Sequence, residues 1–409
     1  MRPSTRVCRC FSMVFVAVAL GCLAGCVLPP ETSETGLPVG ALLPFTGDIA
    51  AAGTNIERAA RLALEEVNGA GRVGGERLRL ISRDTHSDTR RGLEAARDLL
   101  NEPGLRVILG PEDEDLASNL IGLISARQVL QISGGVTSPT FRNVQDGGFF
   151  FRTCPSASLY GRALADRMRQ DGVTSAAVLY VNSEYGSGFA AVLSSELALR
   201  SIEVSALVSF DPQQANYSKV LQTLLTAHPE GLVLVAYPGT GAAIVQEWAV
   251  RGGRGRWYLT PALKSEGFVV NVPPGALDGA VGVAPALATD AASFAAKFGE
   301  RWAGDYPLDA AYFYYDAAAL SALALARVAR GGQTPDNATL PGALQEVSSP
   351  PGEPVAWSDL ARGLEMIQRG VDIDYQGVTG SMDFDEQGDV LAQEARFWTI
   401  EDDRIREEP

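Results

Sequence analysis

Short apolar segments alternate with longer segments of helical periodicity along most of this chain. The clearest example runs from Val107 to Phe141. Apolar residues 107–109 end at Gly110-Pro111, and the mainly apolar residues 129–132 end at Ser133-Gly134-Gly135. Between them, leucine and isoleucine recur at helical spacing. A strand, a helix and a second strand in this order predict two parallel neighbours whose carboxyl ends meet at one edge of a sheet.

The same alternation extends on both sides of this stretch. Before it, the pattern predicts strands over 39–43 and 78–81 and helices over 55–68 and 89–101. After residue 149 a second series begins, with helices between strands predicted over 176–181, 203–209, 231–236 and 257–259. Repeated β-α units with short loops predict an α/β fold with doubly wound parallel sheets. The periodicity by itself suggests two domains, one following the other.

The last third of the chain changes character. It predicts helices over 294–303, 310–330, 340–346 and 358–369. The segment 377–384, a turn rich in Asp and Gly, and the segment 395–400 then predict a β-hairpin.

The amino-terminal segment is predicted to be an export signal and not part of the folded domain. Residues 1–25 combine three arginines with a short apolar run, which is typical of a signal peptide. Leu23-Ala24-Gly25-Cys26 resembles a bacterial lipobox, so Cys26 is the expected site of lipidation; an ordinary secretory signal with an incidental cysteine is the alternative. Residues 26–37 are rich in Pro, Ser and Thr and indicate a tether.

Charge and cysteine content narrow the function. The chain carries −15, and removing residues 1–25, with three arginines and no acid, leaves −18. Such an acidic protein has no electrostatic basis for binding nucleic acid or an anionic membrane surface. After lipidation of Cys26, Cys154 is the one remaining thiol, so an intrachain disulfide is excluded.

Motifs for catalysis or for a cofactor are weak. His86 and His228, the two histidines, lie in separate segments, which argues against a histidine-built metal site or a Ser-His-Asp triad. Gly239-x-Gly241 follows a strand but lacks the third glycine of a dinucleotide loop. Asp383 and Asp385 favour a polar turn over a metal site. We therefore predict no catalytic residue, no metal and no cofactor.

Seven segments resemble one family in the order in which that family has them. They are GALLPFTG at 40–47, AARLALEEVNGAG at 59–71, ILGP at 108–111, SGGVTSP at 133–139, FRTCP at 151–155, YDA at 315–317 and YQGVTGSMDFD at 375–385. Together they resemble the leucine/isoleucine/valine-binding group of type I periplasmic binding proteins.

This resemblance implies two Rossmann-like lobes joined by three crossovers, with a ligand held in the cleft. The crossovers are expected near Thr153, Pro285 and Tyr375. The first lobe is then expected to comprise 38–153 and 285–374, and the second 154–284 and 375–409.

The resemblance also implies site residues. Val136 and Thr137 match positions whose backbone and hydroxyl face the carboxylate of an amino acid ligand, and Gly135 leaves the adjacent backbone bare. Tyr185 and Tyr237 match aromatic residues that line the cleft. The alternatives are a tight turn that needs glycine for its geometry alone, and half-buried loop tyrosines.

Several expected anchors for an amino acid are replaced. Glu114 stands where the family usually has a serine, and it would repel a carboxylate. Ala262 stands where an acid usually binds the amino group, with Lys264 two residues on, and Ala52 replaces an aromatic residue.

These departures suggest a different ligand, either cationic or without an amino acid head group. The alternative for the acids at 112–115 is that they cap the helix that follows. A shift of the loop by one residue would instead restore Ser118 to the site.

The expected function is that of a solute-binding lipoprotein of the periplasm or cell envelope. It would capture a small polar molecule of amino acid, amide or amine type for an ABC permease in the inner membrane, held to the membrane by its lipid alone. The alternative is an envelope sensor or assembly regulator that keeps the fold with a divergent or empty cleft.

Overall fold

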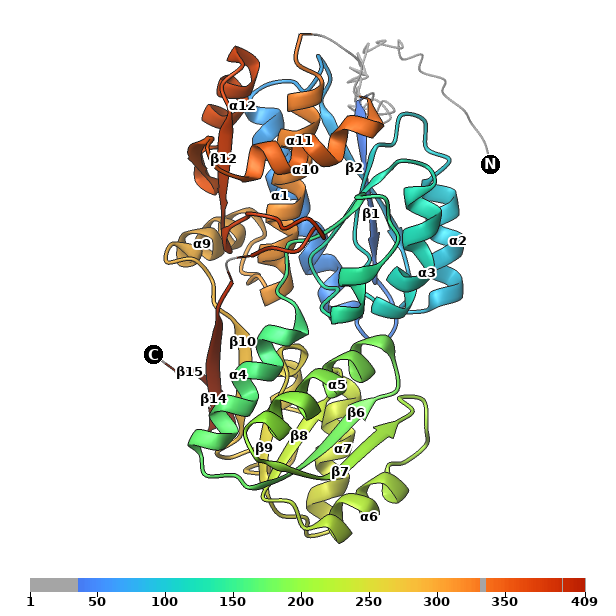
Figure 1. Ribbon diagram of the computed structural model, residues 1–409, viewed down its shortest axis with the longest axis vertical. Coiled ribbons are helices and arrows are strands. Elements are labelled where there is room, and N and C mark those ends of the chain that lie inside the picture. Colours follow the sequence, from blue (N-terminus) through green and yellow to red (C-terminus); the bar gives the residue numbers. More distant parts are fainter. Residues whose placement is uncertain (1–35, 332–335, 392, 409) are drawn as a thin grey trace, which may run out of the picture. The chain divides into compact units, whose positions relative to one another are not determined.

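The computed structural model describes residues 36–331, 336–391 and 393–408 (Figure 1). The predicted signal peptide, Cys26 and nearly all of the predicted tether lie outside these residues. In the described part, no helix is both long enough and apolar enough to cross a membrane.

One group of strands forms a five-stranded parallel sheet in the order β2-β1-β3-β4-β5. Its strands are β1 (Leu37–Leu43), β2 (Leu78–Asp84), β3 (Val107–Leu109), β4 (Leu130–Ser133) and β5 (Phe150–Arg152). The predicted pairing of 107–109 with 129–132 is confirmed, with Val107 opposite Leu130. Adjacent parallel strands bring the loops after β3 and β4 to the same edge.

Helices cover both faces of this sheet because its strand residues alternate between two apolar clusters. Val39, Ala41 and Leu43 pack with α1 (Ala50–Ala70) and α10 (Asp309–Val328), which lie beside each other (Figure 1). Leu42 and Ile108 pack with α2 (Thr89–Leu99) and α3 (Glu114–Ser125) on the other face. We call this sheet and its helices the first lobe.

Other elements from the last third of the chain extend the first lobe. A small sheet in the order β11-β12-β13 packs near α10, with β11 (Glu353–Ala356), β12 (Ile373–Gly377) and β13 (Gly380–Ser381). The accompanying helices are α9 (Ala291–Arg301), α11 (Leu340–Ser348) and α12 (Leu360–Arg369). The four helices predicted in this third are therefore confirmed, with shifted ends.

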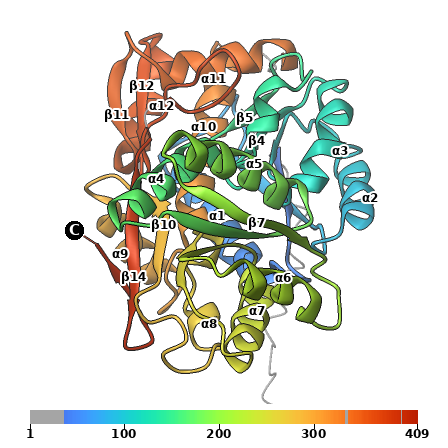
Figure 2. The same cartoon turned by 60° about the horizontal axis from the view of Figure 1, so that its bottom comes forward.

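A seven-stranded sheet in the order β15-β14-β10-β9-β8-β6-β7 forms the second lobe. Helices α4 and α5 lie on one side of its parallel part, and α6 and α7 lie on the other (Figure 2). Its strands are β6 (Ser175–Val181), β7 (Glu203–Phe210), β8 (Gly231–Val235), β9 (Arg256–Leu259), β10 (Val281–Pro285), β14 (Ala395–Glu401) and β15 (Arg404–Glu407). Its helices are α4 (Ala157–Gln170), α5 (Glu184–Leu199), α6 (Ser218–Ala227), α7 (Pro238–Val250) and α8 (Glu266–Val269).

The predicted hairpin between 377–384 and 395–400 is wrong. The segment 395–401 is β14, which pairs antiparallel with β10 and with β15, while β13 turns back on β12. The reversal between β14 and β15 occurs at Asp402 and Asp403, whose φ angles are 51° and 55°. Two separate turns, one between β12 and β13 and one between β14 and β15, therefore replace the single long hairpin that the Gly and Asp residues suggested.

The third crossover lies later than the expected position near Tyr375. Tyr375, Val378, Met382 and Phe384 are buried in the core of the first lobe. The chain reaches the second sheet only at Ala395. Apolar burial of 375–384 against α10 accounts for the difference.

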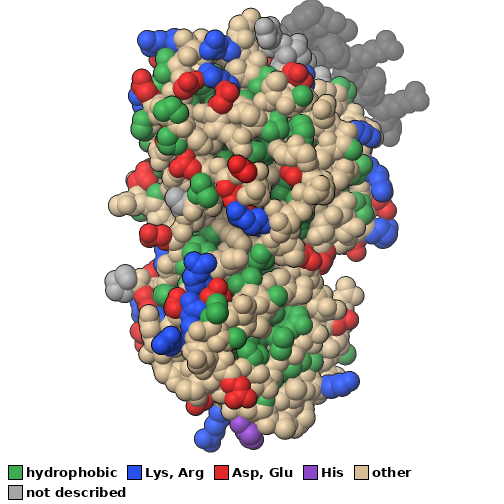
Figure 3. Space-filling model, in the orientation of Figure 1, with side chains coloured by type: hydrophobic (Ala, Val, Ile, Leu, Met, Phe, Trp, Pro, Cys, Tyr) green, Lys and Arg blue, Asp and Glu red, His purple; other side chains and the backbone are tan. Residues whose placement is uncertain are grey.

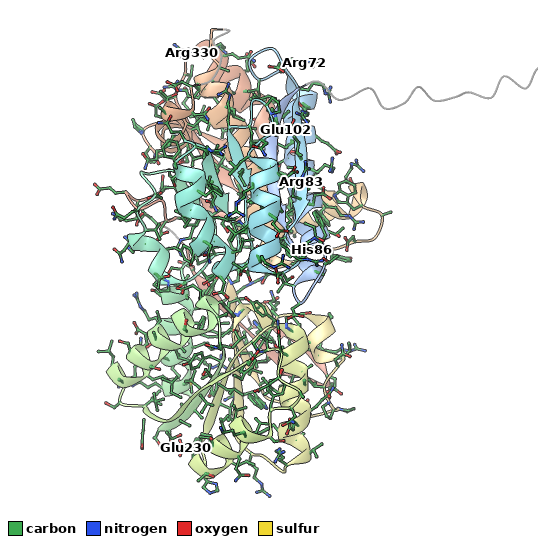
Figure 4. All side chains as sticks on the ribbon, turned by 90° about the vertical axis from the view of Figure 1, so that its right-hand side faces the viewer. Arg72, Arg83, His86, Glu102, Glu230 and Arg330 are labelled. Atoms are coloured by element: carbon green, nitrogen blue, oxygen red, sulfur yellow. The ribbon has the colours of Figure 1, made fainter. Side chains whose placement is uncertain are left out.

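The surface bears mixed charge. Acidic and basic side chains are interspersed over the face shown in Figure 3. His86 lies at the carboxyl end of the first sheet, whereas Arg72 and Arg330 lie at the opposite end (Figure 4). The Nδ1 of His86 lies 2.7 Å from Thr46 Oγ1 and 3.0 Å from Asp84 Oδ2, which makes it a local support of the loop after β1.

Candidate ligand site

The carboxyl ends of both sheets border one cavity of about 430 Å³. From the first lobe, the loops after β1, β3 and β4 reach it. From the second lobe, the loops after β6, β8 and β9 reach it. A cavity of this volume accommodates a small organic molecule.

Glu114 lies in this cavity wall and is held by the loop after β4. Its Oε1 accepts hydrogen bonds from Thr137 N at 2.7 Å, from Thr137 Oγ1 at 2.9 Å and from Ser138 N at 3.1 Å. The side chain is 2% exposed. Two backbone N–H groups and a hydroxyl form a typical anion-binding arrangement, and here a side chain of the protein fills it.

The remaining donors of this loop are also used within the protein. We call residues 135–138 the donor loop. Gly135 N and Val136 N both donate to Ser133 Oγ at 3.2 Å. Ligand contact by Gly135 therefore stays a prediction: the residue borders the cavity, and its N–H is bonded to Ser133 Oγ. A Cβ at this position would lie 2.0 Å from Glu112 Oε2, so any other residue would displace the Glu112 carboxylate.

Arg152 supports the donor loop from behind. Its Nη1 donates to Ser138 O at 2.8 Å and to Val136 O at 3.3 Å. Its Nε and Nη2 bind the carboxylate of Asp389 at 2.7 Å each. The charge of Arg152 is thus paired with Asp389, and the guanidinium fixes the loop without entering the cavity wall.

Glu112 and Glu114, two residues apart where the loop after β3 leads into α3, both border the cavity, and we call these two residues the acid pair. The Oε2 atoms of both are buried and have no hydrogen-bond partner within the described part of the chain. Burial raises the pKa of Glu112 to about 7, with the Tyr314 hydroxyl lowering it and Asp113 raising it. Burial also raises the pKa of Glu114 to about 7, against its hydrogen bonds to the donor loop and against Arg152.

These pKa values predict that the protein loses stability as pH rises from 4.5 through 7. The reference pKa of each carboxyl is 4.5, so the folded state binds more protons than the unfolded state between pH 4.5 and about 7. This contribution is fully present below pH 4.5 and is lost above the folded-state pKa. Urea titrations at pH 5.5 and 8 are expected to give a lower free energy of unfolding at pH 8.

Glu114→Gln serves as the internal comparison for this profile. Glutamine stays neutral and keeps an acceptor for the donor loop, so we expect it to flatten the pH dependence. Asp316, whose pKa burial raises to about 6, contributes in the same direction and is unchanged in this variant. A profile with the same slope in both proteins would contradict the assignment.

Aromatic side chains form much of the remaining wall. Tyr185 stacks on Tyr237 with ring centroids 5.4 Å apart, and Tyr185 Oη donates to Thr260 Oγ1 at 2.9 Å. The further aromatic residues of the wall are Tyr160, Phe189 and Phe313. Aromatic faces exclude water and attract cations.

Lys264 also borders the cavity, but its charge is already matched. Its Nζ lies 2.8 Å from Glu407 Oε1 and 3.3 Å from Asp309 Oδ2. It is the one basic residue of the cavity wall within the described chain, whereas Asp48, Glu112, Glu114 and Asp309 also border the cavity. The site is therefore acidic overall.

The four acidic residues at 112–115 have three different roles. The acid pair borders the cavity, Asp113 caps a helix, and Asp115 contacts the second lobe, so helix capping explains only one of them. Asp113 caps α3 by accepting from Leu116 N at 2.6 Å. Asp115 accepts from Glu184 N at 2.9 Å, at the start of α5 in the other lobe. Glu184 in turn accepts from Ser138 Oγ at 3.1 Å. These contacts join the lobes at one side of the cavity.

Most of the residues suggested by the resemblance border this cavity: Glu114, Gly135, Thr137, Tyr185, Tyr237 and Lys264. Val136 does not border it and is 0% exposed within an apolar cluster. Ser118 is exposed on α3, so the loop shift that would restore it to the site does not occur. Ala52 and Ala262, the two replaced anchors, do border the cavity.

Sequence reasoning missed three acidic residues of this wall, Asp48, Glu112 and Asp309. Glu112 was grouped with the capping acids, although its place just after a strand end was a usable signal. Asp309 begins α10, far from the strand-end loops in the sequence, and no local pattern identified it. Within the described residues, no group of three or more His, Cys, Asp or Glu side chains is arranged to hold a metal ion.

Comparisons with known proteins agree with this architecture. The family model described as "Periplasmic binding protein" matches residues 36–362. The chemotactic signal transduction system substrate-binding protein BasB of Halobacterium salinarum is 27% identical over 355 residues, covering 84% of this chain and 82% of BasB. Leu/Ile/Val-binding protein homolog 2 of Brucella abortus is 26% identical over 324 residues, covering 77% of this chain and 84% of the relative.

Among solved structures, a leucine-binding protein, LivK, from Thermotoga maritima superposes with a TM-score of 0.77. The match covers 91% of this chain and 98% of LivK at 18% sequence identity, and at this identity it shows a shared fold only. The two-lobed architecture, the cavity at the strand ends and the match of the family model lead to one conclusion: the chain belongs to the periplasmic binding protein family, has the type I fold, and is similar to Leu/Ile/Val-binding members of that family.

Proposed function

We propose that this protein captures a small polar organic molecule of amino acid, amide or amine type between its lobes and delivers it to an ABC permease in the inner membrane. The observation that carries the proposal is the cavity bordered by strand-end loops of both lobes, with stacked Tyr185 and Tyr237 and several carboxylates in its wall. Such a wall offers an apolar surface for the body of a ligand and polar groups for its head. Family membership supports binding rather than catalysis.

The proposal includes a location at the cell envelope, with Cys26 as lipid anchor. That part rests on the sequence, because Cys26 lies outside the described residues. For delivery of the ligand, we expect the lobes to close on it first and the closed protein then to dock to the permease.

A thermal-shift screen tests ligand capture. The purified protein is heated with amino acids, amides, amines and short carboxylic acids. A ligand at a hundred times its Kd adds about 2.7 kcal/mol of stability, which raises the Tm by several degrees in a protein of this size. A hit confirmed by calorimetry at one site per chain supports the proposal. No shift with any class would contradict it.

Chemotactic sensing is the second candidate function. It is favoured by the similarity to BasB, whose name assigns it to chemotactic signal transduction. The two functions use the same cavity and differ in the membrane partner. Deleting the gene and measuring uptake of the labelled ligand beside swimming toward it separates them: loss of uptake indicates transport, and loss of the response with normal uptake indicates sensing.

A further inference from the structure

The donor loop has no free hydrogen-bond donor left for a ligand's carboxylate. Thr137 N, Thr137 Oγ1 and Ser138 N converge on Glu114 Oε1, and the two preceding N–H groups converge on Ser133 Oγ. An anionic ligand would have to displace Glu114 from three hydrogen bonds. It would then meet the charge of that side chain in an enclosed site.

The second carboxylate oxygen of Glu114, Oε2, accepts no hydrogen bond from the described residues. All three donors bind Oε1, so Oε2 is left buried without a partner. Within the same part of the chain, Glu112 Oε2 is also buried without a hydrogen-bond partner, and the hydroxyl of Tyr314, which lowers the pKa of Glu112, is a neutral donor near that carboxylate. A buried carboxylate oxygen without a partner is costly. A proton or a hydrogen-bond donor relieves that cost, and a positively charged donor does so most strongly.

The surrounding charges do not supply that donor. Arg152 is paired with Asp389, and Lys264 is paired with Asp309 and Glu407. The groups that face the acid pair from neighbouring elements are Asp113, the hydroxyls of Tyr314, Tyr185 and Tyr237, and the thiol of Cys154. None of these is a cation.

We propose that the ligand's head group is an organic cation, a protonated amine or a guanidinium, bound by the acid pair while the aromatic wall contacts its body. This deepens the proposed function by naming the ligand class, and it rests on that function. Glu114 thus takes the place in the donor loop that a ligand's carboxylate would need. Glu112 and Glu114 are the specificity-determining residues.

Matched ligands of different charge test the proposal on the wild-type protein. Isopentylamine, isovaleramide, isovalerate and leucine share a branched carbon chain and present a cation, a neutral amide, an anion and a zwitterion. Benzylamine, benzamide and benzoate, and agmatine with 4-guanidinobutyrate, repeat the comparison for other shapes. In at least one set, the compound with a cationic head and no carboxylate is expected to bind at least tenfold more tightly by calorimetry.

Isosteric variants then assign the effect to the acid pair. Glu112→Gln and Glu114→Gln each remove a charge, and Glu114→Gln keeps an acceptor for the donor loop. Each is expected to weaken cation binding at least tenfold. Glu230→Gln is the matched control. Glu230 lies at the far end of the second lobe (Figure 4), and its Oε2 likewise accepts from a backbone N–H and a hydroxyl, those of Thr174, at 2.7 and 3.0 Å. The affinity of this variant for the cation should equal that of the wild type.

A reciprocal variant frees the donor loop. Glu114→Ala exposes Thr137 N, Thr137 Oγ1 and Ser138 N, and it is expected to gain measurable binding of isovalerate or benzoate. Circular dichroism confirms that it folds. If it does not fold, the two glutamine variants still decide the question.

The outcomes separate the two proposals. Tighter binding of the anion or the zwitterion by the wild type would overturn the cationic assignment and leave the solute-binding function intact. Cation binding that is unchanged in both glutamine variants would also overturn it. The absence of binding by any compound in any set would contradict the proposed function, and this inference with it.

Discussion

Replacing Arg152 with methionine is expected to lower the free energy of unfolding by about 3–5 kcal/mol, since it leaves a buried acid without its main partner. The Arg152 side chain is 2% exposed, and that of Asp389 is 11% exposed. The substitution also leaves the carbonyls of Val136 and Ser138 without the guanidinium. Urea unfolding followed by tryptophan fluorescence measures the loss.

Arg142→Met provides the matched control. Arg142 binds the same Asp389, at 3.1 Å, but its side chain is 50% exposed. Exposed ion pairs contribute about 0–1 kcal/mol, so this variant should unfold close to the wild type. Equal losses for the two arginines would show that burial does not set the strength of these pairs.

The Arg152 variant should affect the site as well as stability. The donor loop holds Glu114, and Arg152 holds the donor loop through two carbonyls. A protein that still folds at low temperature is therefore expected to bind its ligand more weakly than the wild type. The Arg142 variant should keep its affinity.

Replacing Asp316 with alanine is expected to cost about 3–5 kcal/mol of folding free energy, because several donors lose one buried acceptor. Asp316 is 0% exposed in α10. Its carboxylate accepts from Tyr375 Oη at 2.8 Å, Val378 N at 2.9 Å, Thr379 N at 3.0 Å and Thr379 Oγ1 at 2.7 Å. These bonds attach the turn after β12 to the first lobe.

Gly377 belongs to the same arrangement, since a Cβ there would lie 2.5 Å from Asp316 Oδ2. The graded control is Tyr375→Phe, which removes one of the four hydrogen bonds and should cost about 0.5–1.5 kcal/mol. Differential scanning calorimetry of both variants gives the comparison. A smaller loss for Asp316→Ala than for Tyr375→Phe would be inconsistent with this role of the carboxylate.

The sequence by itself determined the α/β class and most strands and helices of this protein. Apolar runs that end at Gly, Pro or Ser mark strands in a buried parallel sheet, and this local signal located β3 and β4 together with their loops. Motif order gave the family. The resemblance also suggested Glu114, Thr137, Tyr185 and Tyr237 as site residues, and all four border the cavity. They come together because loops at the carboxyl ends of parallel strands reach one edge of a sheet.

Only the tertiary structure decided how the polar groups of the site are paired. Glu114 accepts hydrogen bonds from Thr137 and Ser138, which follow it by more than twenty residues in the sequence. Lys264 forms ion pairs with Asp309 and Glu407, which lie in distant segments of the chain. Periodicity reports which face of an element is buried, but a hydrogen bond between two loops depends on how their strands are placed side by side. For the same reason, the third crossover follows the packing of 375–384 against α10, and the resemblance, which implied a crossover near Tyr375, did not locate it.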